Sequence, residues 1–154
     1  MKREEIIQAI NDKLKEMSIE TIVFHQVVAD VLGLHITDHK CLDLLHHFGA
    51  MPAGKLGELI GLTTGAVTGA IDRLEKAGYA RRRKDPKDRR LTIVEPTGNK
   101  KYRKKIEMIF KPLHERMYKL LSSYSDGELA FLLNTTTDIT AQIHADSKRL
   151  RNMH

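Results

Sequence analysis

Apolar residues recur at helical spacing along the start of the chain. Ile6, Ile10 and Leu14 follow one another at steps of four residues, which predicts an amphipathic helix over residues 4–17. The apolar positions continue to Gly33, so Ser18 either caps a second helical segment or lies inside one long helix. This region carries more apolar surface than a small domain needs for its own core, which indicates a partner chain.

A short helix and a connection are expected next. Thr37 or Asp38 is expected to cap a helix that ends at Gly49. Residues 51–54 contain Pro and Gly and are expected to form a connection. A second short helix then covers residues 55–60, with its apolar residues facing inward.

The helix that follows completes a helix-turn-helix pattern. Gly61 permits a tight turn into a longer helix over residues 62–78, which Thr63 or Thr64 can cap. Its apolar residues recur at three- and four-residue steps and so predict one buried face. A short helix, a Gly turn and a longer helix are typical of a helix-turn-helix.

The period then changes from that of a helix to that of a strand. Residues 79–84 and 91–95 are predicted to be two short strands around the turn sequence DPKDR. A helix followed by a basic hairpin is the winged form of the helix-turn-helix. This shape suits DNA, because the helix can enter a major groove while the hairpin tip reaches the backbone or the minor groove.

Two long helices are predicted for the last third of the chain. Thr97 is expected to cap the first of them, and Pro112 is expected to kink it or loosen one turn. The sequence SDGE at residues 125–128 is a capping box that opens the second. Their apolar stripes exceed what a winged helix requires, which predicts a dimer interface; packing within one chain is the alternative.

Charge is concentrated in the predicted winged region. The chain has 154 residues and a net charge of +6. Residues 73–105 hold 14 Lys and Arg against 4 Asp and Glu, a balance of +10, so the rest of the chain sums to −4. A basic patch on a mildly acidic body indicates a polyanion as the partner of one face. A solvated charged face is the alternative.

Residues 55–100 hold a set of specific sequence marks, which are Asp72-Arg73-Leu74-Glu75, Gly78, Arg82, the run DPKDRR at residues 85–90, and Pro96-Thr97-Gly98. With these marks the segment resembles the MarR family of winged helix-turn-helix transcription regulators. The helix order extends the resemblance over nearly the whole chain. It implies a mainly α fold with a small β wing, in which a winged helix-turn-helix domain joins a helical dimerisation region.

The expected division places the DNA-binding domain in residues 35–97 and the dimerisation region in residues 1–34 and 98–150. The resemblance further implies a homodimer on a pseudo-palindromic operator in double-stranded DNA. Relatives of this kind usually act as repressors that a small ligand or an oxidant releases.

The first turns of the helix over residues 62–78 are where family members meet the major groove. Thr63, Thr64, Gly65 and Thr68 lie there, and threonine can offer a hydroxyl to a base or phosphate and a methyl to thymine. The alternative for Thr63 is a capping role alone. Gly69 stands where many relatives carry a longer polar or basic side chain, so DNA shape is expected to contribute to specificity.

Lys87 and Arg89 lie at the predicted wing tip. One is expected to enter the minor groove and the other to meet phosphate. By resemblance, Asp88 and Arg90 match the Asp-x-Arg wing motif of the family, in which the recognition-helix aspartate, here Asp72, steadies the arginine. The alternative for Arg90 is a scaffold role rather than a DNA contact.

Further arginines are expected to contact the DNA backbone. Arg73 is a candidate phosphate clamp, and residues 81–84 add phosphate contacts, each of which steepens the salt dependence of binding.

An effector pocket in this family commonly lies where the dimer helices meet the winged domain. Candidate lining residues here are His25, Cys41, His46 and His47. Cys41 is either a redox sensor or a plain buried cysteine, and reactive cysteines of peroxide-sensing relatives lie in the first helix. No cofactor and no dedicated metal site are expected, because the chain lacks HExxH or clustered Cys/His spacing. The histidines considered for a metal are His25, His39, His46, His47, His114 and His144.

Other classes of function remain as alternatives to a sequence-specific regulator. A non-specific architectural DNA-binding protein would use the basic patch without choosing an operator. A winged helix that docks protein is another. An enzyme is not expected, because no nucleophile elbow, phosphate loop or acid–base pair is evident. The single cysteine, and the lack of a signal peptide or a bilayer-spanning stretch, predict a cytoplasmic protein without membrane contact.

Overall fold

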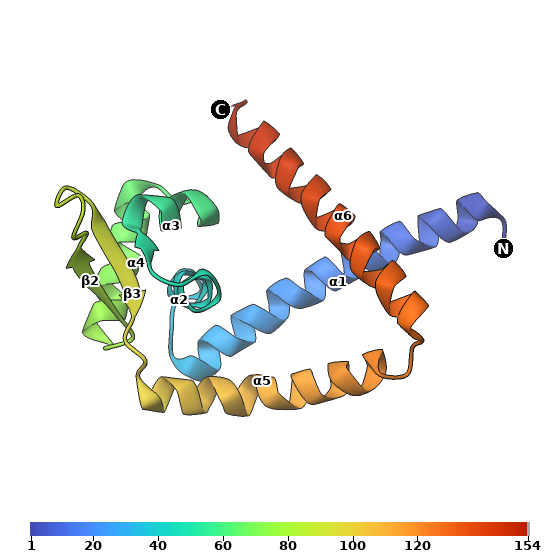
Figure 1. Ribbon diagram of the computed structural model, residues 1–154, viewed down its shortest axis with the longest axis horizontal. Coiled ribbons are helices and arrows are strands. Elements are labelled where there is room, and N and C mark those ends of the chain that lie inside the picture. The colour runs from blue at the N-terminus through green and yellow to red at the C-terminus, as the bar shows by residue number, and fades with distance from the viewer. Residues whose placement is uncertain (154) are drawn as a thin grey trace. The chain divides into compact units, whose positions relative to one another are not determined.

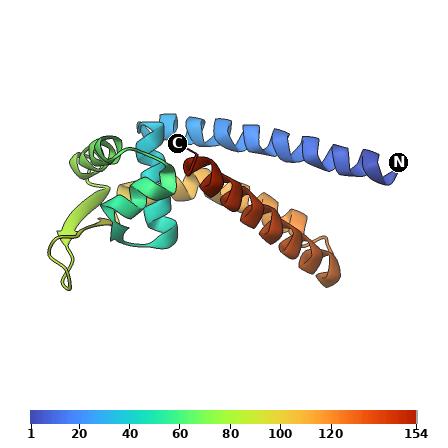
Figure 2. The same cartoon turned by 90° about the horizontal axis from the view of Figure 1, so that it is seen from above.

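The computed structural model describes residues 1–153, which are mainly helical with one small antiparallel sheet (Figures 1 and 2). This confirms the predicted fold class. The chain divides into two compact units, one over Met1–Glu107 and one from Met108 onward. The elements are, in order, α1 (Arg3–Leu32), α2 (Ile36–Phe48), β1 (Met51–Pro52), α3 (Ala53–Ile60), α4 (Thr64–Lys76), β2 (Ala80–Lys84), β3 (Thr92–Pro96), α5 (Lys100–Leu121) and α6 (Asp126–Arg151).

Helix α1 is one continuous helix that passes through Ser18. At its start the Lys2 backbone N–H donates to the Glu5 carboxylate at 2.9 Å, which is one half of a capping box. Gly33 ends it in the left-handed conformation, with φ of 68°, which favours glycine. Only Val28, Ala29 and Leu32 of α1 are buried.

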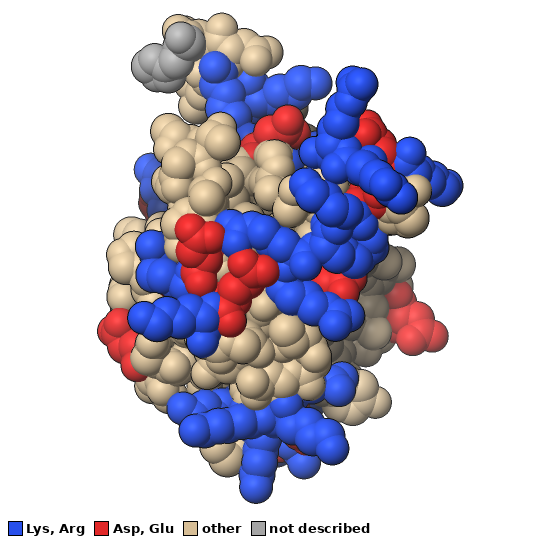
Figure 3. Space-filling view, turned by 90° about the vertical axis from the view of Figure 1, so that its left-hand side faces the viewer, with Lys and Arg blue, Asp and Glu red and all other residues tan. Residues whose placement is uncertain are grey.

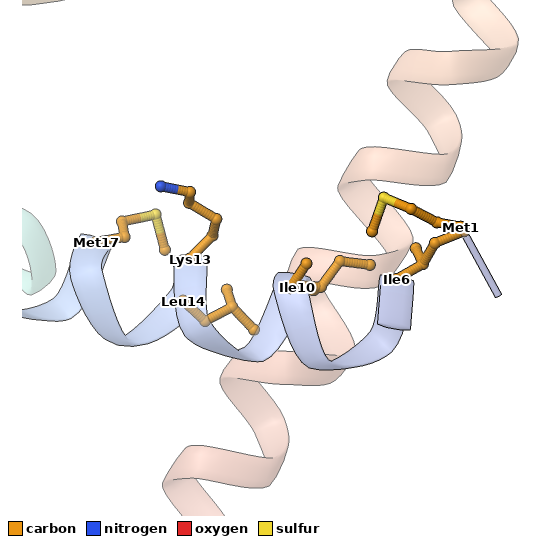
Figure 4. Close-up of a pocket in the computed structure, with 7 residues that line it drawn as sticks. Met1, Ile6, Ile10, Lys13, Leu14 and Met17 are labelled. Atoms are coloured by element: carbon orange, nitrogen blue, oxygen red, sulfur yellow. The ribbon is translucent and has the colours of Figure 1, made fainter. Parts of the chain in front are cut away.

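The apolar residues earlier in α1 are largely exposed. Ile6, Ile10, Leu14 and Met17 line an open groove along this helix (Figure 4). Further along, Ile22 and Val31 are also more than half exposed. The predicted excess of apolar surface is therefore present on the isolated chain.

The start of α2 differs from the prediction. His35 caps it by accepting the Thr37 backbone N–H at its Nδ1, at 3.3 Å, so neither Thr37 nor Asp38 is the cap. The physical reason lies in Asp38, whose side chain turns inward to bind Arg73 and is buried. Its carboxylate is thus unavailable to the orphan N–H groups of the first turn.

The helix-turn-helix is present, with one addition. Gly61 takes a φ of 79°, and Thr63 caps α4 by accepting the Ala66 N–H at 3.3 Å. The region expected to be a plain connection instead holds β1, whose Met51 pairs with Val94. Two residues are too few to show a strand period, and Pro52 favoured a turn interpretation.

The sheet has the order β1-β3-β2 and covers one side of a core formed with α2, α3 and α4. Complete burial of a large apolar side chain stabilises a fold by about 1.5–3 kcal/mol. The largest fully buried apolar side chains are Leu42, Leu45, Leu56, Ile71, Leu74, Val28 and Val94. This core fixes α4 and the β2–β3 hairpin, which we call the wing, with respect to each other.

Helix α5 begins two residues later than expected, at Lys100. Asn99 rather than Thr97 bonds its first turn, by accepting the Tyr102 backbone N–H at 3.0 Å. The Thr97 hydroxyl instead donates to the Gly78 carbonyl at 2.7 Å, which ties the end of β3 to the end of α4. Pro112 lies inside α5 without ending it.

The predicted capping box of α6 is confirmed. The Ser125 N–H donates to the Glu128 carboxylate at 2.8 Å, and the Glu128 N–H donates to the Ser125 hydroxyl at 3.4 Å. No residue of α6 is buried in the described chain. Phe131, Leu133 and Ile143 are each more than 60% exposed, so this helix also presents apolar surface.

Among residues 1–153, no single helix is long and apolar enough to cross a bilayer. The pair α1 and α2, bent by 98° at the break between them, meets that test of length and composition only jointly.

Candidate nucleic-acid interface

Helix α4 exposes its first turns. Val67, Ala70, Ile71 and Leu74 are buried against the core, which leaves the opposite face of the helix outward. The residues of the first turns expected to meet DNA, namely Thr63, Thr64, Gly65 and Thr68, are all exposed. The structure therefore presents these four positions to any partner that approaches α4.

Arg82 of β2 joins the wing to α4. Its guanidinium bonds the Glu75 carboxylate, lies 2.7 Å from Asp72 Oδ1 and donates to the Thr68 carbonyl at 3.2 Å. The Arg82 backbone N–H also donates to Glu75 at 2.6 Å. Arg82 pairs with buried Val94 across the sheet, and side chains opposite each other in a sheet share a face, so its side chain lies toward α4.

This contact differs from the partner that the family resemblance implied for Asp72. Asp72 bonds Arg82, whereas the Arg90 guanidinium has no ion pair or hydrogen bond within residues 1–153. The physical reason is position, because the Arg82 side chain lies on the face of β2 next to α4, whereas Arg90 lies in the loop between β2 and β3. Arg82, interpreted from sequence as a phosphate contact, is thus used within the protein.

The wing loop is held by two aspartates. Asp85 accepts the backbone N–H groups of Lys87 at 2.7 Å and Asp88 at 3.2 Å. Asp88 accepts the Arg90 backbone N–H at 3.0 Å. Sequence reasoning placed Asp85 in the turn sequence DPKDR but assigned a supporting role only to Asp88.

The opposite face of the wing carries a cross-strand cluster. Glu95 of β3 accepts Arg81 Nε at 2.7 Å and Arg83 Nε at 2.8 Å. These hydrogen bonds, from Arg83 first and then Arg81, lower the pKa of the Glu95 carboxyl below its ordinary value. Two of the β2 arginines are therefore partly neutralised by one acid.

Arg73 of α4 is also engaged inside the chain. Its Nε and Nη2 bind Asp38 at 2.8 and 2.7 Å, a bidentate pair that joins α4 to α2. The Asp38 side chain is 3% exposed and the Arg73 side chain 53% exposed. Sequence reasoning expected Arg73 to clamp phosphate and missed this pair, because its members lie 35 residues apart.

The wing tip leaves Lys87, Arg89 and Arg90 exposed. Figure 3 views the molecule from the wing side and shows lysine and arginine side chains over much of this face, with acidic side chains among them. A surface of this kind attracts polyanions.

The four residues considered for an effector pocket have different neighbours. His25 Nδ1 lies 3.2 Å from His39 Nε2, His46 stacks on Tyr102, and His47 meets the Phe48 ring edge-on. Cys41 is fully buried, and burial raises the pKa of its thiol to about 11.

His39, which lies next to His25, is almost fully buried. Burial lowers the pKa of its imidazole, and its Nδ1 has no hydrogen-bond partner within the described chain. In the same part of the chain, no group of three or more His, Cys, Asp and Glu is gathered closely enough to hold a metal ion.

Comparison with known proteins gives matches of three kinds. The MarR family model matches residues 34–92. The HTH-type transcriptional regulator YcgE of Bacillus subtilis (strain 168) is 38% identical over 150 residues, which cover 97% of this chain and 96% of that protein.

Solved structures match the fold. The transcriptional regulator BldR from Sulfolobus solfataricus is 26% identical, with a TM-score of 0.59, and the match covers 92% of this chain and 99% of BldR. A MarR family protein from Bacillus stearothermophilus has a TM-score of 0.69 at 16% identity, covering 94% of this chain and 99% of that one, which shows a common fold.

Proposed function

Because the chain belongs to the MarR family of transcriptional regulators, we propose that it binds double-stranded DNA sequence-specifically as a homodimer and represses transcription until an effector releases it. The operator would be pseudo-palindromic, since a two-fold dimer presents two equal half-site readers. The observation that carries the proposal is the fastening of a basic wing to an exposed helix through Arg82.

The proposed division of labour follows the exposed residues. Thr64, Gly65 and Thr68 enter the major groove. Thr63 caps α4 by accepting the Ala66 N–H, and the other N–H groups of the first turn meet phosphate. At the wing tip, Arg89 and Lys87 divide minor-groove and phosphate contacts. The backbone of the loop that carries these two residues is held by hydrogen bonds to Asp85 and Asp88 of the same loop.

Three residues act in support of these contacts. Asp72 steadies the wing through Arg82, and Asp88 fixes the backbone that carries Arg90. Arg90 then adds a phosphate contact from the loop. For Arg73 we propose a supporting role in place of a phosphate clamp, because two of its N–H groups already bind Asp38.

Homodimerisation is supported by the apolar surface of the long helices. Ile22, Val27 and Val31 of α1 are each more than half exposed, and so are Phe131 and Leu133 of α6. Surface of this extent favours closure by a second copy. We therefore propose residues 1–34 and 98–150 as the dimerisation region and residues 35–97 as the DNA-binding domain.

For the effector, we propose a small molecule whose site draws on His25, Cys41, His46 or His47. These residues lie on α1 and α2, and α2 is joined to α4 by the Asp38–Arg73 pair. A ligand that shifts α2 would therefore act on the helix that meets DNA. No catalytic role is proposed, and localisation in the cytoplasm follows from action on DNA.

A non-specific architectural DNA-binding protein is the second candidate, and the local charge of +10 over residues 73–105 favours it. The two candidates differ in sequence preference. A specific regulator binds its operator at least about 10³-fold more tightly than random DNA at one salt concentration, whereas an architectural protein does not.

The deciding experiment selects bound fragments from a random double-stranded pool and measures affinity for the selected and scrambled duplexes at fixed salt. Light scattering on the same sample gives the mass of the free protein. A dimer with a large preference for a two-fold-symmetric sequence supports the proposal. A stable monomer, or equal affinity for both duplexes, would overturn it.

A further inference from the structure

The charged side chains of α4 are mostly engaged within the protein. Asp72 and Glu75 bind Arg82, and Arg73 binds Asp38. Lys76, in the last turn, is the remaining charged residue of α4, and it lies about 18 Å from Thr64 at 1.5 Å per residue. The first turns of the helix therefore present no long charged donor or acceptor to a base.

Two glycines lie on the outward face of these turns. Gly65 and Gly69 are four residues apart, so they share one side of the helix, roughly opposite the buried Ile71 and Leu74. A Cβ added at Gly65 would have no atom within 4 Å, and one at Gly69 would meet only the flexible end of Arg73, at 3.4 Å.

Neither glycine is explained by the fold. Neither has a positive φ, so neither needs the conformational freedom of glycine. Glycine destabilises a helix relative to alanine, and alanine at position 65 would clash with nothing in this chain. An external surface that lies close to the helix backbone would account for the missing side chains.

Two threonines border this bare strip on one side. Thr64 and Thr68 are exposed, and each carries a methyl group beside its hydroxyl. In the major groove, thymine is the base that presents a 5-methyl group, whereas bidentate recognition of guanine or adenine requires Arg, Lys, Asn or Gln. None of these four residue types lies in the first two turns of α4.

We propose that α4 reads thymine 5-methyl groups through the methyl groups of Thr64 and Thr68, with Gly65 and Gly69 letting the helix backbone lie against the base edges. This inference rests on the proposed DNA-binding function and names what that site recognises. Each half-site then carries thymines beneath the first turns of α4. Discrimination there comes from apolar contact rather than from base-edge hydrogen bonds.

The direct test replaces single thymines of the selected operator by deoxyuridine, which removes the 5-methyl and keeps every hydrogen-bonding group. At positions under α4, we expect each replacement to weaken binding about fourfold, the value of one buried methyl. Replacement under the wing, where the minor groove is unchanged, is the matched control and should leave affinity unaltered. Equal affinity for all singly replaced duplexes would overturn the proposal.

A protein variant tests the close approach. Gly65→Ala should leave the melting temperature unchanged or raise it, yet weaken operator binding at least fivefold, because the added methyl meets the groove. Gly127→Ala is the matched control, since Gly127 is also the second residue of its helix and also has open space around its Cβ position. Because Gly127 lies in the proposed dimerisation region, light scattering on this variant checks that the dimer is intact, and operator affinity should then be unchanged.

Unchanged operator affinity of Gly65→Ala would overturn the close approach. These outcomes are separable from failure of the function itself. A protein that prefers its operator but is indifferent to deoxyuridine still functions as a regulator, whereas one without operator preference fails at the earlier step.

Discussion

Replacement of Arg73 by alanine should destabilise the protein far more than its exposed position suggests. The Asp38 side chain is 3% exposed, so Arg73→Ala leaves a buried carboxylate without its bidentate partner. Breaking a fully buried pair in this way costs about 3–5 kcal/mol. Because Arg73 is half exposed and water can enter from its side, we expect about 2–4 kcal/mol of unfolding free energy.

Urea denaturation and thermal melting measure this loss, which corresponds to a fall in melting temperature on the order of 10 °C for a chain of this size. Asp38→Asn is the matched variant. Its amide oxygen still accepts one N–H from Arg73, and the arginine remains partly in water, so it should cost only about 1 kcal/mol. The double variant should reveal a coupling energy of about 1–3 kcal/mol.

The same variant separates the two roles considered for Arg73. If it clamps phosphate instead, Arg73→Ala would leave stability unchanged and reduce the slope of log K against log salt by about one. An unaltered urea midpoint would refute the reasoning from burial.

Three further predictions follow from the wing and the core. Arg82→Ala should lower the unfolding free energy by about 1–2 kcal/mol, because the partly shielded Glu75 loses its arginine partner. Arg81→Ala should cost less, because Glu95 stays paired with Arg83. Equal denaturation midpoints for the two variants would contradict this asymmetry. Arg89→Ala should weaken operator binding by about 1–3 kcal/mol in a fluorescence titration, whereas Arg116→Ala should leave it unchanged. An equal loss of operator affinity in both variants would contradict a specific contact by the wing. Burial raises the pKa of the Cys41 thiol from 9.0 to about 11, so with rising pH this thiol ionises in the unfolded chain before it ionises in the folded protein. The stability that the neutral thiol confers is therefore complete below pH 9 and is lost as the pH rises to about 11. Urea denaturation between pH 9 and pH 11 should show a smaller loss of unfolding free energy for Cys41→Ala than for the unaltered protein. Parallel plots of unfolding free energy against pH for the two proteins would contradict this role of the thiol.

The order of elements was accessible from sequence because each carries a local signal. The spacing of buried residues in α4, the glycine before it and the capping box of α6 are all contained within a few neighbouring residues. The predicted helix order and the hairpin therefore agree with the structure.

The contacts that fix the interface were not accessible in the same way. Arg73 meets a partner 35 residues away, and Arg82 meets Thr68 across 14 residues, so no local period reports either contact. In the sequence, both arginines belong to a basic segment, and nothing local distinguishes them from the arginines that remain exposed. Which arginines are bound internally is decided by the face of the strand or helix on which each one lies.

The sharing of Glu95 between Arg81 and Arg83 has a consequence for behaviour in salt. An arginine already paired with a carboxylate holds few condensed anions and displaces few cations from a phosphate backbone. The number of positive charges on the wing is therefore larger than the number of counterions released when the protein binds DNA. The affinity for a polyanion should therefore decrease less steeply with ionic strength than the number of lysines and arginines suggests. The protein should bind DNA over a wider range of salt concentrations.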